Sequence, residues 1–142
     1  MKKMDSKIKN DITKAVGLEP FANTLGIKLV DMDTGYAVVE LFYDPEKMKN
    51  LFNRAHGGAI FALIDEAFQI SCQTHGDIAV ALNVNVTYIS SPAEKTLLRA
   101  TAKEVSKTRK TGTYDIRVTD TSGSLIATCQ ALAYRTGKPL PF

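Results

Sequence analysis

The sequence has few cysteines and no apolar run long enough to cross a membrane. Its two cysteines, Cys72 and Cys129, make neither a disulfide framework nor a metal site. The longest apolar runs, such as 59–64, stop far short of the roughly 20 residues that a membrane helix needs. Residues 1–20 contain lysines but no continuous apolar segment, so we expect no secretory signal. A cytoplasmic protein with free thiols is therefore predicted.

The sequence also lacks a strong charge of one sign, internal repeats and low-complexity segments. Its 18 basic and 15 acidic residues give a formal net charge of +3, which is too small and too scattered to indicate nucleic-acid binding. The chain has 142 residues, of which 44% are hydrophobic and 23% are charged. This composition excludes the disordered, collagen-like and disulfide-rich classes of protein. We expect one domain over residues 1–142, with residues 1–25 as an N-terminal helical extension.

Helical and strand patterns follow one another along the chain. Asp5 or Ser6 can cap a first helix that stops at Gly17, and a helical turn covers residues 19–25. A period of two over residues 27–42 predicts a hairpin. The one long helical pattern, Gly58 to His75, is apolar on every side in its first two turns and is expected to be buried. Four strand patterns follow at 81–88, 96–105, 112–119 and 124–134, which we expect to form a meander. An antiparallel sheet wrapped on one apolar helix is an α+β fold.

Two glycines at the start of the long helix, Gly57 and Gly58, form the first candidate site. They leave bare backbone N–H groups at the positive end of the helix, where such groups polarise an anion or a developing oxyanion. The alternative is that the glycines only let the loop turn sharply into the helix.

Asp65 is the second candidate, two turns into the same helix and among apolar neighbours such as Phe61 and Ile64. A carboxylate in that place either reaches a cavity or is costly to bury. Gln69 lies one turn further on the same face and could orient it. The alternative is that Asp65 and Glu66 belong to a solvated stripe of the helix.

Helix geometry connects the two candidates. Gly57 and Asp65 are eight residues apart, about 12 Å along the axis, so they cannot act on one carbonyl from the same helix. Two antiparallel copies of the helix, related by a two-fold axis, would place Gly57 of one chain beside Asp65 of the other. Chemistry that uses both residues therefore requires a dimer.

An asparagine, a His-Gly-Gly triplet and an aspartate on the central helix resemble the PaaI-type hot-dog acyl-CoA thioesterases. The residues are Asn50, 56–58 and Asp65, and the similarity extends to the strand 85–88 and its exit at 91–93. The resemblance implies a hot-dog fold, in which a six-stranded antiparallel sheet wraps a long central helix. It also implies dimers, commonly dimers of dimers, and hydrolysis of an acyl- or aryl-CoA thioester to free acid and CoA. No metal or redox cofactor is expected, and CoA enters only as part of the substrate.

The same resemblance implies roles for individual residues. Asp65 would be the nucleophile or general base, the Gly57 N–H would polarise the thioester carbonyl, and Asn50 would position substrate or water. His56 is expected to form hydrogen bonds at the helix entry rather than to act as the base, and with Gly58 to contact substrate.

Two positions depart from the family pattern. Asn53 stands where the family often has glycine, and asparagine is the next residue best able to adopt a left-handed conformation. Ala81 stands near the place where some relatives have a serine or threonine that holds water. Asn83 or Gln69 could take over that role, so both are predicted to contact substrate.

Basic residues gather around the predicted turn between the strands 96–105 and 112–119. They are Lys103, Lys107, Arg109 and Lys110. Such a group is either a solvated hairpin tip or, for Lys107, Arg109 and Lys110, an electrostatic seat for the phosphates of CoA.

Two other functions fit the same pattern. A non-catalytic acyl-CoA-binding module would be expected to lack the carboxylate, whereas Asp65 is present. A hot-dog hydratase or dehydratase depends on a pair of Asp and His, and His56 is in the wrong position for that pair. The acyl group is left open, since Phe52, Phe61 and Phe68 could line an acyl pocket or simply pack in the core.

Overall fold

The structure, a computed structural model, describes residues 3–142. Its helices are α1 (Ser6–Gly17), α2 (Pro20–Leu25), α3 (Pro45–Met48) and α4 (Gly57–Gln73). Its strands are β1 (Lys28–Asp33), β2 (Tyr36–Tyr43), β3 (Asp77–Tyr88), β4 (Thr96–Lys107), β5 (Thr111–Thr119) and β6 (Leu125–Pro139). Residues 1 and 2 of the expected N-terminal extension lie outside the described part.

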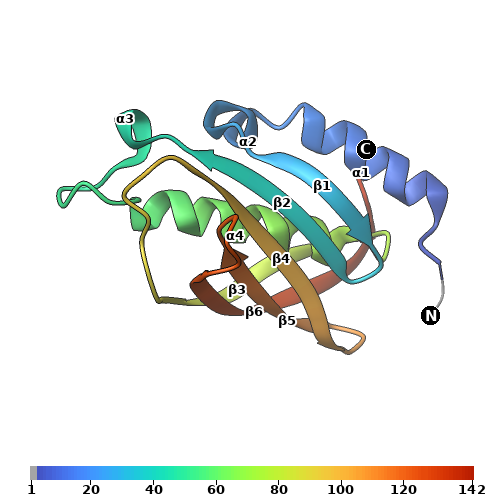
Figure 1. The fold of residues 1–142 in the computed structure, drawn as a ribbon. Helices are drawn as coiled ribbons and strands as arrows, with labels where there is room; N and C mark the ends of the chain where they lie inside the picture. The colour runs from blue at the N-terminus through green and yellow to red at the C-terminus, as the bar shows by residue number, and fades with distance from the viewer. Residues whose placement is uncertain (1–2) are drawn as a thin grey trace.

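Six antiparallel strands form one curved sheet around α4 (Figure 1). The apolar side chains of α4 meet those of the sheet in a common core, in which Leu63, Ile64, Val39, Leu98 and Ile116 are almost inaccessible to solvent. This burial explains why the first turns of α4 are apolar on several sides. The expected α+β architecture, a long central helix wrapped by six antiparallel strands, is confirmed.

The strand order β1-β2-β4-β5-β6-β3 corrects the expected meander of the last four strands. β3 does not pair with β4, the next strand in the sequence. It pairs with β6, from Asp77 opposite Pro139 to Tyr88 opposite Ala127, while β4 lies beside β2. The segment 89–95, which contains Pro92, carries the chain across to the other side of the sheet. Alternating patterns identify strands but not their partners, so this pairing was not predictable from short turns alone.

The element boundaries differ from the expected ones at several places. α4 begins at Gly57 and ends at Gln73, so His75 lies beyond the helix, where its Nε2 contacts Glu104 Oε2 at 2.6 Å. The helix expected to run to His75 therefore ends two residues earlier. β3 begins before residue 81, and β6 continues to Pro139. The short helix α3 was missed, although Asp44 caps it and Pro45 occupies its first turn, as is common at helix starts.

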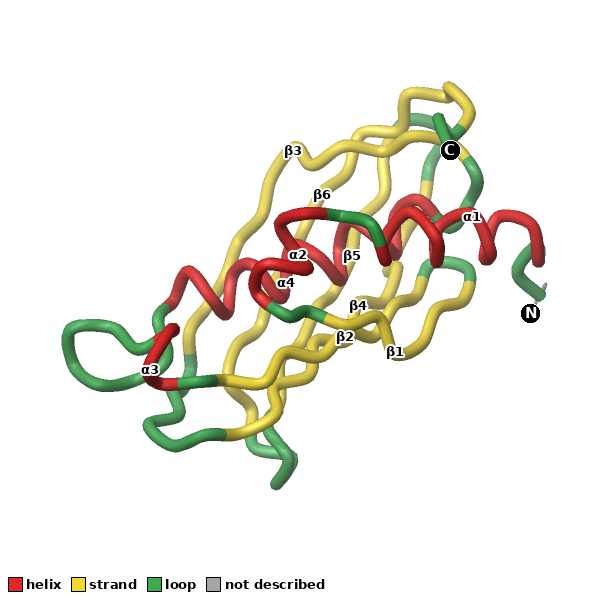
Figure 2. Tube along the Cα trace, turned by 90° about the horizontal axis from the view of Figure 1, so that it is seen from above, coloured by secondary structure: helices red, strands yellow, loops and turns green. Residues whose placement is uncertain are grey.

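α1 and α2 run across the open side of the wrapped sheet, over α4 (Figures 1 and 2). As expected, Asp5 caps α1, because its Oδ1 accepts the backbone N–H groups of Lys7 and Ile8 at 2.8 and 3.1 Å. Ile8 of α1 lies so close to the turn after α4 that a Cβ on Gly76 would be 2.8 Å from Ile8 Cδ1. Within the described residues, no helix is long and apolar enough to span a membrane.

Candidate active site

Within residues 3–142, the N-terminus of α4 presents one backbone donor without a partner. Gly57 is the first residue of the helix, so its N–H has no acceptor within α4. The N–H of Gly58 instead donates to His56 Nδ1 at 2.8 Å, which makes His56 the cap of the helix. His56 thus has the hydrogen-bonding role expected at the helix entry. The expectation of two bare N–H groups is corrected to one, because the cap occupies Gly58.

The loop before α4 brings Asn50 close to Gly57. Asn50 Oδ1 accepts the N–H groups of Phe52 and Arg54 at 2.8 and 3.1 Å, and Asn53 has a φ of 60°. The left-handed conformation predicted for Asn53 is therefore confirmed. Asn50, Gly57 and Tyr88 together line a hollow of about 320 Å³. Asn50 thus shapes the loop through its side-chain oxygen and also lines the hollow in which the Gly57 end of α4 lies.

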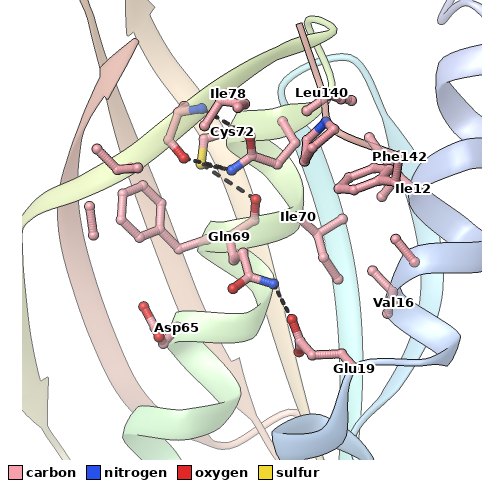
Figure 3. A pocket seen from close by; sticks show the side chains of 17 residues that line it. Ile12, Val16, Glu19, Asp65, Gln69, Ile70, Cys72, Ile78, Leu140 and Phe142 are labelled. Atoms are coloured by element: carbon pink, nitrogen blue, oxygen red, sulfur yellow. Dashed lines mark hydrogen bonds between the residues drawn. The ribbon is translucent and has the colours of Figure 1, made fainter. Parts of the chain in front are cut away.

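Asp65 lies half-buried beside a larger cavity of about 550 Å³ (Figure 3). Burial raises the pKa of its carboxyl above the ordinary value, and the charge of Glu19 raises it further. Of the two interpretations of Asp65, the structure supports the one in which the side chain reaches a cavity. A carboxylate held in such a place is a stronger base than an exposed aspartate.

Gln69 does not orient Asp65 in this structure. Its amide nitrogen donates to Glu19 Oε2 at 2.5 Å and to Glu66 Oε1 at 3.3 Å (the bond to Glu19 is drawn in Figure 3). Glu19, at the start of α2, reaches this position only because the N-terminal helices fold back over α4. That long-range contact occupies the amide of Gln69, which was expected to orient Asp65 one turn away on the same helix.

Glu66 is a buried acid that the sequence did not single out. Its side chain is only 5% exposed, and its pKa is raised to about 9. Burial is the largest cause, followed by a hydrogen bond to Glu19 and by the charges of Glu19 and Asp65. Glu66 is therefore protonated at neutral pH, and it is too buried to belong to the solvated stripe that was the alternative interpretation of Asp65 and Glu66. No local pattern distinguishes these adjacent acids, because one of their acidic neighbours, Glu19, is distant in the sequence.

The protonation of Glu66 makes the stability of the fold depend on pH. A carboxyl whose pKa is raised on folding stabilises the fold below its unfolded pKa, and this contribution is lost as the pH rises. The free energy of unfolding is thus expected to fall between about pH 4.5 and about pH 9. Glu66→Gln should flatten this dependence and raise the melting temperature at alkaline pH. Thermal unfolding at several pH values measures this pH dependence, with Glu46→Gln at an exposed position as the control. The same change of melting temperature with pH in the wild type and in Glu66→Gln would contradict the prediction.

The three phenylalanines considered for an acyl pocket have different surroundings. Phe52 is exposed in the loop before α4, and Phe61 is 37% exposed on α4. The interpretation that these two side chains pack in the core is therefore wrong. Phe68 is buried, lines the cavity beside Asp65 and lies against Tyr114 with ring centroids 5.5 Å apart.

Ala81, which departs from the family pattern, and Asn83, the predicted substitute for its water-holding role, both lie on β3. Ala81 lines the cavity beside Asp65, whereas Asn83 is exposed and accepts a hydrogen bond from Asn85. The pairing of β3 with β6 shifts register between Ala81 and Asn83. The two positions therefore do not continue one regular ladder.

The basic residues lie at the tip of the β4–β5 hairpin. Lys107, Arg109 and Lys110 are exposed there, and Lys103 is exposed on β4. Because Glu104 of β4 contacts His75, this hairpin is at the C-terminal end of α4, opposite to Gly57 in the same chain (Figure 1). A seat for CoA phosphates at this tip would thus be closer to the Asp65 half of the helix.

Sequence comparison agrees with this arrangement of residues. Residues 52–127, which contain both Gly57 and Asp65, match the thioesterase superfamily. The chain belongs to this superfamily. A protein of Archaeoglobus fulgidus is 38% identical over 117 residues, which are 82% of this chain and 75% of that protein. The acyl-coenzyme A thioesterase PaaI of Escherichia coli is 32% identical over 82% of each chain.

Solved structures of this superfamily have the same fold. The PaaI protein of Escherichia coli, from the phenylacetic acid degradation operon, superposes with a TM-score of 0.90. The superposition covers 96% of this chain and 98% of PaaI at 28% sequence identity. A Streptococcus mutans protein bound to acetyl-CoA superposes with a TM-score of 0.76 and 26% identity, over 80% of this chain and 91% of that protein. The PaaI-type resemblance and the hot-dog fold expected from it are therefore confirmed.

Proposed function

We propose that the chain is an acyl-CoA thioesterase that hydrolyses an acyl- or aryl-CoA thioester to free acid and CoA. The observation that carries this proposal is one face of α4, on which an unused N–H at Gly57 and a half-buried carboxylate at Asp65 stand two turns apart. The superfamily membership, the thioesterase relative and the acetyl-CoA-bound neighbour support the same chemistry.

The proposed reaction uses Gly57 and Asp65 on opposite sides of the thioester. The Gly57 N–H binds the carbonyl oxygen and stabilises the negative charge that develops on it. Asp65 either removes a proton from the attacking water or attacks the carbonyl carbon itself. The C–S bond breaks, the sulfur leaves as CoA thiolate and takes up a proton, and water supplies the oxygen and hydrogen of the acid. Asn50, in the hollow next to Gly57, positions the substrate or water.

The proposed site is completed by a second copy of the chain. Gly57 and Asp65 line two different hollows, and a helix separates residues eight positions apart by about 12 Å along its axis. Gly57, Phe61 and Asp65 follow one another at intervals of four residues, so they share one face of α4. Phe61 is partly exposed at the middle of this face. An antiparallel copy of α4, with the two-fold axis near Phe61, would bring each Gly57 to the partner's Asp65.

The edge of the sheet supports the same assembly. β3 is an edge strand of 12 residues, and its apolar side chains at Val80, Leu82 and Tyr88 are exposed. A long apolar edge of this kind is an aggregation hazard unless another strand covers it. We propose that the partner's β3 pairs with it in a homodimer and that two such dimers form a tetramer.

The exposed hairpin tip is proposed to bind the phosphates of CoA. Replacing Lys107, Arg109 and Lys110 by alanine should then raise KM for CoA thioesters and leave kcat nearly unchanged, because contacts far from the reacting atoms act mainly in binding. A truncated thioester without the nucleotide serves as control substrate, and the variant should hydrolyse it with the same kcat and KM as the wild type. Equal effects on both substrates would leave the tip as a solvated turn.

We further propose that the reaction needs no metal or redox cofactor. Thioester carbonyls have little resonance stabilisation, so a helix end and one carboxylate suffice for their hydrolysis. Cys72 and Cys129 are buried free thiols, which suits the proposed cytoplasmic location. Burial raises the pKa of Cys72 to about 12, so its thiol is not a nucleophile at neutral pH. The whole chain is proposed to act as one domain, because α1 and residues 140–142 both line the cavity at Asp65.

The proposed activity is tested by release of free CoA from short, medium, long and aryl acyl-CoAs, followed with a thiol reagent. We expect release from at least one class of thioester. Binding without release would indicate an acyl-CoA-binding module. Conversion of an unsaturated acyl-CoA without release would indicate a hydratase, and either result would overturn the thioesterase.

A further inference from the structure

The cavity beside Asp65 has walls from both terminal segments of the chain. Ile12, Ala15 and Val16 of α1 form one side, and Leu140 and Phe142 form another. Phe68 and neighbouring residues of α4, with the start of β3, complete it. Figure 3 shows Asp65 at one end of the cavity and Ile12 and Phe142 on the far side. Of the segments that line the cavity, α4 and β3 lie within residues 52–127, which match the superfamily. α1 and residues 140–142 lie outside this match.

α1 is held in place at both of its ends. At one end, Ile8 packs against the turn at Gly76, where a Cβ would come within 2.8 Å of Ile8 Cδ1. Just past the other end, Glu19 accepts the hydrogen bond from Gln69 of α4 at 2.5 Å. Ile12, between these two points, is 2% exposed. The α1 side of the cavity is thus a fixed wall, whereas Phe142 remains 51% exposed at the rim.

The charges around the cavity are of one sign. Among the described residues that line it, Glu19 and Asp65 are acidic, and no lysine, arginine or histidine is present. The remaining lining is mainly aliphatic and aromatic. Such a cavity favours an uncharged apolar group and disfavours one that ends in a carboxylate, since like charges repel and an unpaired buried charge is costly.

We propose that this cavity receives the acyl group of the substrate, and that Ala15 of α1 and Phe142 of the C-terminal segment determine the size of acyl group that is accepted. The inference rests on the proposed thioesterase function, since Asp65 acts at the carbonyl carbon in that reaction. The acyl group bonded to this carbon would then lie in the adjacent cavity. It defines the substrate class as thioesters of uncharged apolar acids. A volume of about 550 Å³ is within the range of small-molecule pockets.

Two substitutions change the cavity in opposite directions. Ala15→Leu adds volume on α1 with a residue of high helix propensity. Phe142→Ala removes a half-exposed ring from the segment after β6, where loss of the fold is not expected. Lys14→Leu places the same side chain on the exposed face of α1 and is the matched control. For each protein, kcat/KM is measured with a series of straight-chain acyl-CoAs, an aryl acyl-CoA and a dicarboxylic acyl-CoA.

Ala15→Leu should lower kcat/KM for the longer and aryl substrates about tenfold or more relative to the short ones, because leucine adds three carbons to an apolar pocket in which one methylene already changes kcat/KM about tenfold. Phe142→Ala should shift the preference toward bulkier groups, and Lys14→Leu should match the wild type. The wild type should discriminate against the dicarboxylic substrate. If the wild type is active but both variants keep its preference, or if the dicarboxylic substrate is preferred, the inference is overturned alone. A wild type inactive on every thioester would remove the proposed function and this inference together.

Discussion

Asp65→Asn is expected to lower kcat by about 10²-fold or more while the fold stays intact, because the amide has nearly the same shape but cannot act as base or nucleophile. The side chain faces a cavity rather than the core, so the substitution leaves no void. Loss of the charge should also remove the cost of its partial burial and its repulsion by Glu19. The variant is therefore expected to melt at or above the temperature of the wild type.

The measurement is the steady-state rate of CoA release, with circular dichroism to check the fold. Asp115→Asn, which makes the same chemical change on β5 and away from the cavity, is the control and should keep wild-type activity. Hydrolysis by Asp65→Asn at near wild-type rate would mean that the carboxylate takes no part in the reaction.

Mixing two inactive variants is expected to restore about a quarter of the wild-type activity, if each site uses Gly57 of one chain and Asp65 of its partner. Asp65→Asn lacks the carboxylate, and Gly57→Pro lacks the polarising N–H. In a mixed dimer, one site receives both lesions and the other receives neither. Random assembly gives about half mixed dimers, each with one intact site of two. CoA release after co-refolding of the two chains, compared with each variant alone, measures the effect.

The structure makes Gly57→Pro a selective change. Gly57 is the first residue of α4, a position at which proline fits helical geometry and removes only an N–H without an intrahelical partner. A Cβ there would lie 3.3 Å from Tyr88 Cζ, so steric contact must be separated from loss of the donor. Gly57→Ala has that Cβ contact and keeps the N–H, and it should stay active. Verified mixed dimers without activity would show that the two residues do not share a site across the two-fold axis.

Local patterns predicted the parts of the site that local forces determine. The apolar periodicity from residue 58 and the neighbouring glycines located α4 within a few residues, and one of the two candidate caps of α1, Asp5, is the actual cap. The left-handed Asn53 followed from its side chain, which tolerates that conformation better than most. These features depend on residues within one turn of each other, so the sequence alone contained enough information.

Contacts between distant segments could not be predicted in this way. Glu19 accepts a hydrogen bond from the amide of Gln69 across 50 positions of sequence, and the same Glu19 raises the pKa of Glu66. The occupation of the Gly58 N–H by His56 depends on one rotamer of the imidazole. The cavity beside Asp65 depends on α1 and on residues 140–142, which meet only after the chain has folded. The composition of the sequence and the spacing of its residues do not indicate which distant segments come into contact.

The pairing of β3 with β6 also determines the order in which the fold can be completed. β3 leaves the ribosome directly after α4, but its ladder partner, residues 127–139, is synthesised after β4 and β5. Until then α4 has no complete cover on that side, and β3 exposes both of its edges. Pairings between distant segments form slowly, and unpaired edges are sites of misassembly during that interval. The wall of the cavity that includes residues 140–142 is consequently among the last parts of the molecule to form.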